Sequence, residues 1–423
     1  MLRKWLVCLL CLALLIPTAV AEEPGALRIV LAGGWLDADG YTGARIETRE
    51  VGGIMEEMAN AFATRNDQID LFVFPAYEGL YSVKAHGYYA PLDGSAVLTG
   101  KLGDLYPAFQ QALTDGEGHL VGWVMSADVM GMSAHHTLLR EYGMPVPDTF
   151  GEMLDICQAM LEAGALPMDE SLLGTVEYNR QGVLDLYMEQ FIRACQLDGG
   201  TVDFTGPEFL AMAERIRTEL PETDPFMGDW AEMSLFEFDL GYTLPEADMV
   251  IKPRVVPDKP NVIEVQMMVA VVNPYSNNKE AAVAFLEWFA TQQRPENYIF
   301  DASLGLMESE WGKERMVTLR EDIARLETAG ELTPEQRDEL EAYRMELASW
   351  EESQWVVSQE AIDFYASLTG GLSISEASPV TYDGALRTAA QRYLNGAYDA
   401  AGFARACQEH ITMIYQENGI PMN

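Results

Sequence analysis

The chain has 423 residues, with 66 acidic and 27 basic side chains and a formal net charge of −39 at pH 7. A field of this sign repels nucleic acid and anionic membrane surfaces, so we expect neither as a partner. The length exceeds what one hydrophobic core usually serves, and it predicts two domains.

Residues 1–21 have the three parts of a secretory signal peptide: a basic head, an apolar run over 6–16 and an A-x-A ending at 19–21. The apolar run is shorter than the ~20 residues that a bilayer-spanning helix needs. Neither Cys8 nor Cys11 follows the small residue of a bacterial lipobox. We therefore expect export, cleavage after residue 21, and a periplasmic, cell-surface or extracellular location without a lipid anchor.

The first part of the remaining chain predicts alternating strands and helices. "LRIVLA" (27–32) and "IDLFVF" (69–74) are apolar and typical of buried strands. "IMEEMANAFATR" (54–65) has apolar residues at helical spacing, and "EGLYSVKAHGYY" (78–89) predicts a helix that ends at Gly87. Strand, helix, strand, helix is typical of a parallel sheet covered by helices.

The middle of the chain changes character after a strand that begins near 118–125. Helices are predicted from Thr149 to Leu220, followed by loops with short strands over 221–260. A strong strand follows at 262–272. The next helix has Asn277 as its predicted cap, with Glu280 three residues on.

Residues 310–352 predict an antiparallel helical hairpin with a narrow apolar seam. The seam consists of Met316, Leu319, Ile323 and Leu326 in one helix and Leu340, Tyr343, Leu347 and Trp350 in the other. Between the helices, Gly330 breaks the run and Thr333-Pro334-Glu335-Gln336 forms a capping box. Two more helices, split at Asn395-Gly396, are predicted over 385–418. The charged faces of the hairpin indicate solvation, and docking of a partner stays open as the alternative.

The reactive side chains give no sign of a metal or cofactor. Past the signal peptide, the three cysteines Cys157, Cys195 and Cys407 lie among apolar residues, which favours buried thiols, although one bridge stays possible. Adjacent His135 and His136 would point about 100° apart on a helix, and no nearby side chain completes a ligand set. We therefore expect no metal and no cofactor.

Four segments, in this order along the chain, carry a resemblance to a known family. They are "IDLFVF" with "KAHGYYAPLD", "LLREYGMPVPDTFGEML", "VAVVNPYSNNKEAAVAFLEWFA" and "AAQRYLNGAYDAAGFARACQEHITMIYQE". In the second, Thr149 and Glu152 form a helix-capping box after a proline loop. The chain resembles bacterial extracellular solute-binding proteins (family 1 type) of ABC transporters. Two departures near the expected cleft are Ala134-His135, where the family often has Tyr-Asn, and a compressed first strand–helix–strand unit. Ligand residues are therefore not carried over from the family.

The resemblance implies an α/β, two-lobed periplasmic-binding-protein-like (type II) fold with a hinge, to which the helical hairpin is an insert. The predicted lobe 1 is 22–121 with 268–305, and the predicted lobe 2 is 122–267 with 306–423. The lobes would close over a ligand by a hinge motion.

Candidate ligand residues are polar and aromatic side chains at loops after strands, where open α/β sheets bind ligands. Aromatic rings can stack on sugars or cations, and carboxylates can accept hydroxyl or ammonium protons. The alternative for each aromatic is core packing, and for each acid it is solvation. The candidates are Trp35, Asp37, Tyr77, Glu78, Trp123, Ser126, Asp128, Trp230 and Glu232.

The predicted function is capture of a small solute, with a carbohydrate favoured, and its delivery as a monomer to ABC permease subunits, without catalysis. A small peptide or a cationic solute is the alternative ligand. No hydrolase or phosphate-binding motif is present. Because glycoside hydrolysis needs only two carboxylates, a secreted glycosidase stays open. So does a ligand-sensing adaptor for a receptor.

Overall fold

The computed structural model describes most of the chain after the signal-like segment. The described residues are 25–33, 36, 38–164, 170–174, 176–197, 200–225, 233–238, 249–251, 254–256, 258–294, 297, 299–305, 307–308, 310–329, 332–352, 355–357, 359–374 and 380–420.

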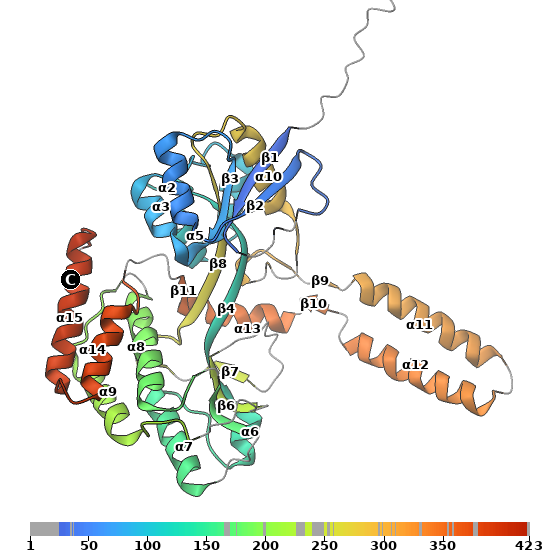
Figure 1. The fold of residues 1–423 in the computed structure, drawn as a ribbon. Helices are drawn as coiled ribbons and strands as arrows, with labels where there is room; N and C mark the ends of the chain where they lie inside the picture. The colour runs from blue at the N-terminus through green and yellow to red at the C-terminus, as the bar shows by residue number, and fades with distance from the viewer. Residues whose placement is uncertain are drawn as a thin grey trace, which may run out of the picture.

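One continuous sheet runs through two lobes, which lie above and below each other in Figure 1. We define lobe 1 and lobe 2 by the two large clusters of buried apolar side chains, the first over 27–127 and 263–300 and the second over 132–236 and 380–415. The strand order is β2-β1-β3-β8-β4-β6-β5, with β11 beside β8 and β7 beside β4. The mixed α/β architecture agrees with the predicted fold class.

Lobe 1 has parallel strands packed under helices. Its strands are β1 (Ala26–Leu31), β2 (Arg45–Glu50) and β3 (Leu71–Pro75), and its helices are α2 (Ile54–Thr64), η1 (Ala76–Glu78), α3 (Leu80–His86), α4 (Ala96–Leu102), α5 (Pro107–Leu113) and α10 (Lys279–Thr291). Gly87 ends α3 with a left-handed φ of 65°, as predicted. The predicted cap of α10 is off by one residue, because Asn278 holds that position.

The compressed first unit keeps its predicted helix, because α2 lies between the parallel strands β1 and β3, and it contains the additional strand β2 before that helix. β1 and β2 pair in parallel, and the loop between them is fixed by Tyr41, whose ring lies 5.1 Å from those of Phe285 and Trp288 on α10. The sequence prediction missed β2, which is polar and mostly exposed at the sheet edge.

Lobe 2 is formed by short strands and long helices. Its elements are α6 (His136–Glu141), α7 (Phe150–Ala163), β5 (Glu170–Gly174), α8 (Arg180–Gln196), α9 (Pro207–Glu219), β6 (Met233–Phe238), β7 (Met249–Ile251), α14 (Gly384–Leu394) and α15 (Ala400–Glu417). The capping box of Thr149 and Glu152 at the start of α7 is confirmed. His135 caps α6 by accepting a hydrogen bond from the Leu138 amide at 3.4 Å.

Two long strands cross between the lobes, and a short third strand lies beside them. They are β4 (Trp123–His135), its antiparallel partner β8 (Ile263–Val272), and β11 (Leu372–Ile374), which runs parallel to β8. The helix α13 (Gln359–Leu368) and the single turn η4 (Thr369–Gly371) lead into β11.

The buried cluster of lobe 1 includes residues on β4, on the start of β8 and near β11. The lobe 1 core extends to Ala127 on β4 and begins again at Ile263, because β4 pairs with β8 from Trp123 to Gly131. Tyr365, Leu372 and Ile374 also belong to the lobe 1 core, although 306–423 was assigned to lobe 2. The reason is that β11 pairs with β8 and brings α13 against the first core.

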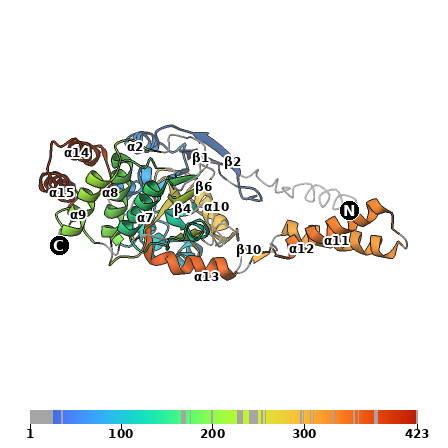
Figure 2. The ribbon, with the colours of Figure 1, turned by 90° about the horizontal axis from the view of Figure 1, so that it is seen from below.

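Two long helices, α11 (Glu310–Thr328) and α12 (Pro334–Glu352), project from the body on a short stem of β9 (Met307–Glu308) and β10 (Trp355–Val357) (Figures 1 and 2). They pack side by side along the predicted seam, where Met316, Leu319, Leu326 and Leu340 are buried. Ion pairs such as Arg315–Glu346 and Arg320–Glu351 connect the two helices.

Candidate ligand cleft

The hinge strands present a polar face between the lobes. On the β4–β8 ladder, Ser126 pairs with Met268 and Asp128 pairs with Gln266. Directly opposite residues share a face, and successive residues alternate between faces. Asp128 and Gln266 are exposed. Alternate residues on the other face are buried, namely Ala127, Val265 and Met267. We call this face the cleft floor; it carries the exposed Asp128 and Gln266, the half-buried Ser126 and the buried Glu264.

The carboxyl ends of the parallel strands of lobe 1 form the rim above this floor. β3 ends at Pro75, which pairs with Met268 of the floor ladder. A depression of about 440 Å³ lies at the ends of β1, β2 and β3, lined by Ala32, Gly33, Glu50, Val51, Gly52 and Glu78. Beside Glu78, the ring of Tyr77 is 56% exposed. This is the edge of an open α/β sheet where ligands bind.

The floor continues into lobe 2 through buried charges. Glu264 pairs with Met130 in the ladder. Its carboxylate forms an ion pair with the guanidinium of Arg193 on α8, with 2.8 Å between nitrogen and oxygen. Arg193 also reaches Glu189 at 3.2 Å. Burial raises the pKa of the Glu264 carboxyl, and the Arg193 guanidinium only partly offsets this effect.

A second cluster of polar side chains lies near Arg193. Arg193 and other residues of α8 line a small cavity together with Val380, Thr381 and Tyr382. The Tyr382 hydroxyl donates a short hydrogen bond to Asp185, which Arg387 approaches to 3.5 Å. Burial raises the pKa of Asp185, against the opposing hydrogen bonds from Tyr382 and Gln181. Carboxylates, an amide, a hydroxyl and a guanidinium group therefore form a polar cluster at α8 and α14 of lobe 2.

The structure places the predicted ligand residues in three groups. Ser126 and Asp128 lie on the cleft floor, and Tyr77 and Glu78 lie at the lobe 1 rim. Trp123 is a correction: it is only 3% exposed, because it begins β4 inside the lobe 1 core and offers no open face to a ligand. Trp35, Asp37, Trp230 and Glu232 lie outside the described residues.

Sequence reasoning missed Glu50, Gln266, Glu264 and Arg193. Glu50 ends the edge strand that was not predicted. Gln266 and Glu264 are the polar residues in the otherwise apolar strand "VIEVQMMVAVV", at alternate positions. That alternation was the available signal, since two polar residues with period two mark one open face of a strand.

The described residues do not form a metal site. Within the ranges given above, no three His, Cys, Asp or Glu side chains gather in a way that could hold a metal ion. Cys157, Cys195 and Cys407 are free thiols, and burial raises the pKa of Cys195 to about 11. No helix of the described chain is both long and apolar enough to cross a bilayer.

Comparison with solved structures gives the fold independently. A cyclic α-maltosyl-1,6-maltose binding protein from Arthrobacter globiformis superposes with a TM-score of 0.57 at 16% identity, over 93% of this chain and 100% of that one. Maltose-bound T. maritima MalE3 gives 0.53 at 13% identity, over 92% and 100%. The bacterial solute receptor AcbH, described as exclusive for β-D-galactopyranose, gives 0.53 at 12% identity, over 93% and 99%.

This chain has the two-lobed fold of solute-binding proteins. No family model matches the sequence, and no curated protein matches it either. At these identities the likeness establishes the fold, and the ligand must be argued from the cleft.

Proposed function

We propose that the protein captures a small carbohydrate between its lobes, outside the cytoplasm, and delivers it as a monomer to the permease subunits of an ABC importer. The observation that carries this proposal is the exposed polar floor at Asp128 and Gln266, on the two strands that connect the lobes. The three solved proteins compared above all carry a sugar in their names or descriptions.

The chemistry of the floor and rim suits a polyhydroxylated ligand. Carboxylates of Asp128, Glu50 and Glu78 can accept hydroxyl protons, and the Gln266 amide can donate and accept. The exposed ring of Tyr77 can cover a C–H face of a sugar. No covalent step is required for this function, because binding and release are its whole cycle.

The proposal is tested by substituting the floor. Asp128→Ala should weaken binding of the preferred sugar by roughly 10- to 100-fold. A hydrogen bond to a charged group contributes about 1.5–3 kcal/mol, and its loss accounts for this change in affinity. Calorimetry should be run on a panel of maltose, maltotriose and D-galactose, with an oligopeptide and a polyamine as competing classes. Glu141→Ala, an exposed acid at the end of α6, is the matched control and should bind as the unchanged protein does.

Two results would overturn the proposal. If the protein binds the peptide or the polyamine and none of the sugars, its ligand is not a carbohydrate. Release of shorter sugars from an incubated oligosaccharide would instead indicate a glycosidase, for which two of these carboxylates would serve as acid and base.

A further inference from the structure

The cleft floor and the lobe 1 rim meet at one level of the sheet. Pro75, the last residue of β3, pairs with Met268 on β8, and Met268 pairs in turn with Ser126 on β4. Neighbouring strands lie about 4.8 Å apart, so the end of β3 lies about 10 Å from Ser126. β4 continues past this level to Asp128, whereas β3 gives way to η1, which carries Glu78. Side chains of the floor and of the rim are therefore close enough to contact one small ligand.

The ionisable side chains of this cleft are acidic. Asp128 on the floor and Glu50 and Glu78 at the rim depression are exposed carboxylates. Within the described part of the chain, none of these three has a hydrogen-bond or ion-pair partner. The described residues that form the floor and line the depression include no basic side chain. A ligand in this cleft therefore meets three carboxylates whose charge these residues do not balance.

Arg193, which contacts the floor from α8, does not balance these carboxylates either. Its guanidinium forms ion pairs with Glu264 at 2.8 Å and with Glu189 at 3.2 Å. Two carboxylates thus share one guanidinium, and the group carries no net positive charge whether or not Glu264 is protonated.

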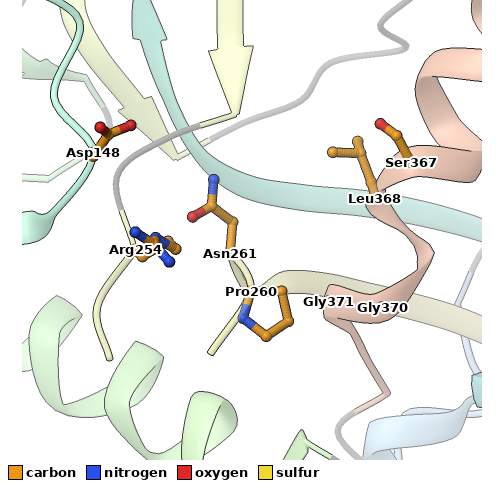
Figure 3. A pocket seen from close by; sticks show the side chains of 8 residues that line it. All are labelled: Asp148, Arg254, Pro260, Asn261, Ser367, Leu368, Gly370 and Gly371. Atoms are coloured by element: carbon orange, nitrogen blue, oxygen red, sulfur yellow. The ribbon is translucent and has the colours of Figure 1, made fainter. Parts of the chain in front are cut away.

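Another hollow of the molecule has a different balance of charge. It has a volume of about 220 Å³ and lies where η4 approaches Asn261, just before β8 (Figure 3). One carboxylate, from Asp148, and one guanidinium, from Arg254, line it, and its other lining residues are uncharged. Its formal charge is therefore zero. The excess of carboxylates is thus a property of the cleft and does not follow from the net charge of −39 alone.

We propose that the cleft binds a sugar that carries a protonated amine, such as a hexosamine, in preference to the neutral sugar of the same shape. The inference rests on the proposed function and names the class of carbohydrate. An ammonium group donates charge-assisted hydrogen bonds to carboxylates, and these are shorter and stronger than hydrogen bonds between neutral groups. The exposed ring of Tyr77, beside Glu78, adds a face that attracts cations. A sugar acid meets like charges in the same place and is disfavoured.

The test compares sugars that differ in one group. Calorimetry should be run with D-galactosamine, N-acetyl-D-galactosamine, D-galactose and D-galacturonate. The β-1,4-linked disaccharide of glucosamine and cellobiose form a second pair, which covers a cleft that holds two rings. Each amine should bind roughly 10- to 100-fold more tightly than its neutral partner. The N-acetyl sugar keeps the nitrogen without its charge and should bind like the neutral sugar, and galacturonate should bind most weakly.

Two isosteric variants locate the ammonium group. Asp128→Asn and Glu78→Gln keep the shape of the side chain and remove its charge. Each should lower the ratio of amine to neutral-sugar affinity by about 5- to 10-fold. The ratio is the readout because any loss of folded protein affects both ligands equally. Glu141→Gln, at the exposed end of α6, is the matched control and should leave the ratio unchanged.

The outcomes separate this inference from the proposed function. If the unchanged protein binds the neutral sugars as tightly as the amines, the inference is wrong and the proposed function stands. An amine preference that neither variant reduces would also overturn the inference, because the ammonium group would then lie away from these carboxylates. If no sugar of either kind binds, the proposed function fails and the inference fails with it.

Discussion

Lobe 1 and lobe 2 are both sheets covered by helices, but they are held together by different kinds of contact. In lobe 1 the fully buried Asp70 accepts hydrogen bonds from the Arg28 amide at 2.8 Å, from its guanidinium at 3.1 and 3.2 Å, and from the Ser276 hydroxyl at 2.6 Å. These bonds connect β1, β3 and the turn before α10. The stability of lobe 1 is therefore expected to depend on charge.

Lobe 2 is stabilised instead by contacts between buried aromatic rings. Phe209 of α9 lies within 4.8–5.9 Å, between centroids, of Phe191, Phe204, Phe403 and Tyr187. Those rings come from α8, α15 and the loop before α9, so one side chain is in contact with three neighbouring segments. The stability of lobe 2 is expected to depend on volume rather than on charge.

The largest expected effect is the loss of ring volume in lobe 2. Phe209→Ala should lower the free energy of unfolding by about 3–5 kcal/mol, because a 1% exposed ring leaves a cavity that its neighbours fill only in part. Urea denaturation followed by circular dichroism measures the change. Met413→Ala, at a 47% exposed position on α15, is the control and should change little.

The next effect is the loss of the buried charge in lobe 1. Asp70→Asn keeps the shape but weakens the hydrogen bonds from Arg28 and Ser276, and should cost about 2–3 kcal/mol. Asp104→Asn removes an exposed partner of Lys101 and should cost no more than about 1 kcal/mol. Equal costs for both variants would show that the burial of Asp70 does not matter.

The pH dependence of the free energy of unfolding should also differ between variants of the two lobes. Burial raises the pKa of Asp70, but hydrogen bonds from Arg28 and Ser276 outweigh burial and hold the pKa below its ordinary value. Its stabilisation is thus complete above the unfolded-state pKa of about 3.9 and is lost as pH falls through the lower folded pKa. Asp70→Asn should flatten the acid limb of the stability curve, whereas Phe209→Ala should shift that limb without flattening it.

The smallest effect is expected outside both lobes. Replacing 310–352 with a short loop between β9 and β10 should leave the main unfolding midpoint nearly unchanged, since the hairpin buries its seam against itself. Differential scanning calorimetry measures the midpoint. Loss of a cooperative transition would show that α11 and α12 belong to a core.

The sequence predicted elements whose pattern is local. The Thr149 capping box depends on residues three apart and the end of α3 on a single glycine, and both are confirmed. Four of the eight residues predicted for the seam of α11 and α12 are buried. β2 was missed because "RIETRE" lies at a sheet edge with little burial, so no apolar alternation marks it.

The location of a candidate residue was predictable where the strand itself carried the signal and not where distant strands set the environment; ligand contact at these residues stays a prediction. Ser126 and Asp128 were placed correctly at the crossing between lobes. Trp123, three residues earlier, was not, because burial depends on how far lobe 1 extends along β4. Glu264 and Arg193 are 71 residues apart in sequence, and only tertiary packing brings them together.

The place of β8 in the sheet has a consequence for the order of folding. β8 lies between β3 and β4, and Val269 to Val272 belong to the lobe 1 core, yet this strand is synthesised nearly 200 residues after β3. A nascent chain that stops before Ile263 lacks the strand that joins both halves of the sheet. The lobe 1 core therefore cannot close early, and closing this long loop makes its folding a late event with slow kinetics. Until β8 is synthesised, one edge of β3 has no partner strand, and a chain in that state is prone to aggregate.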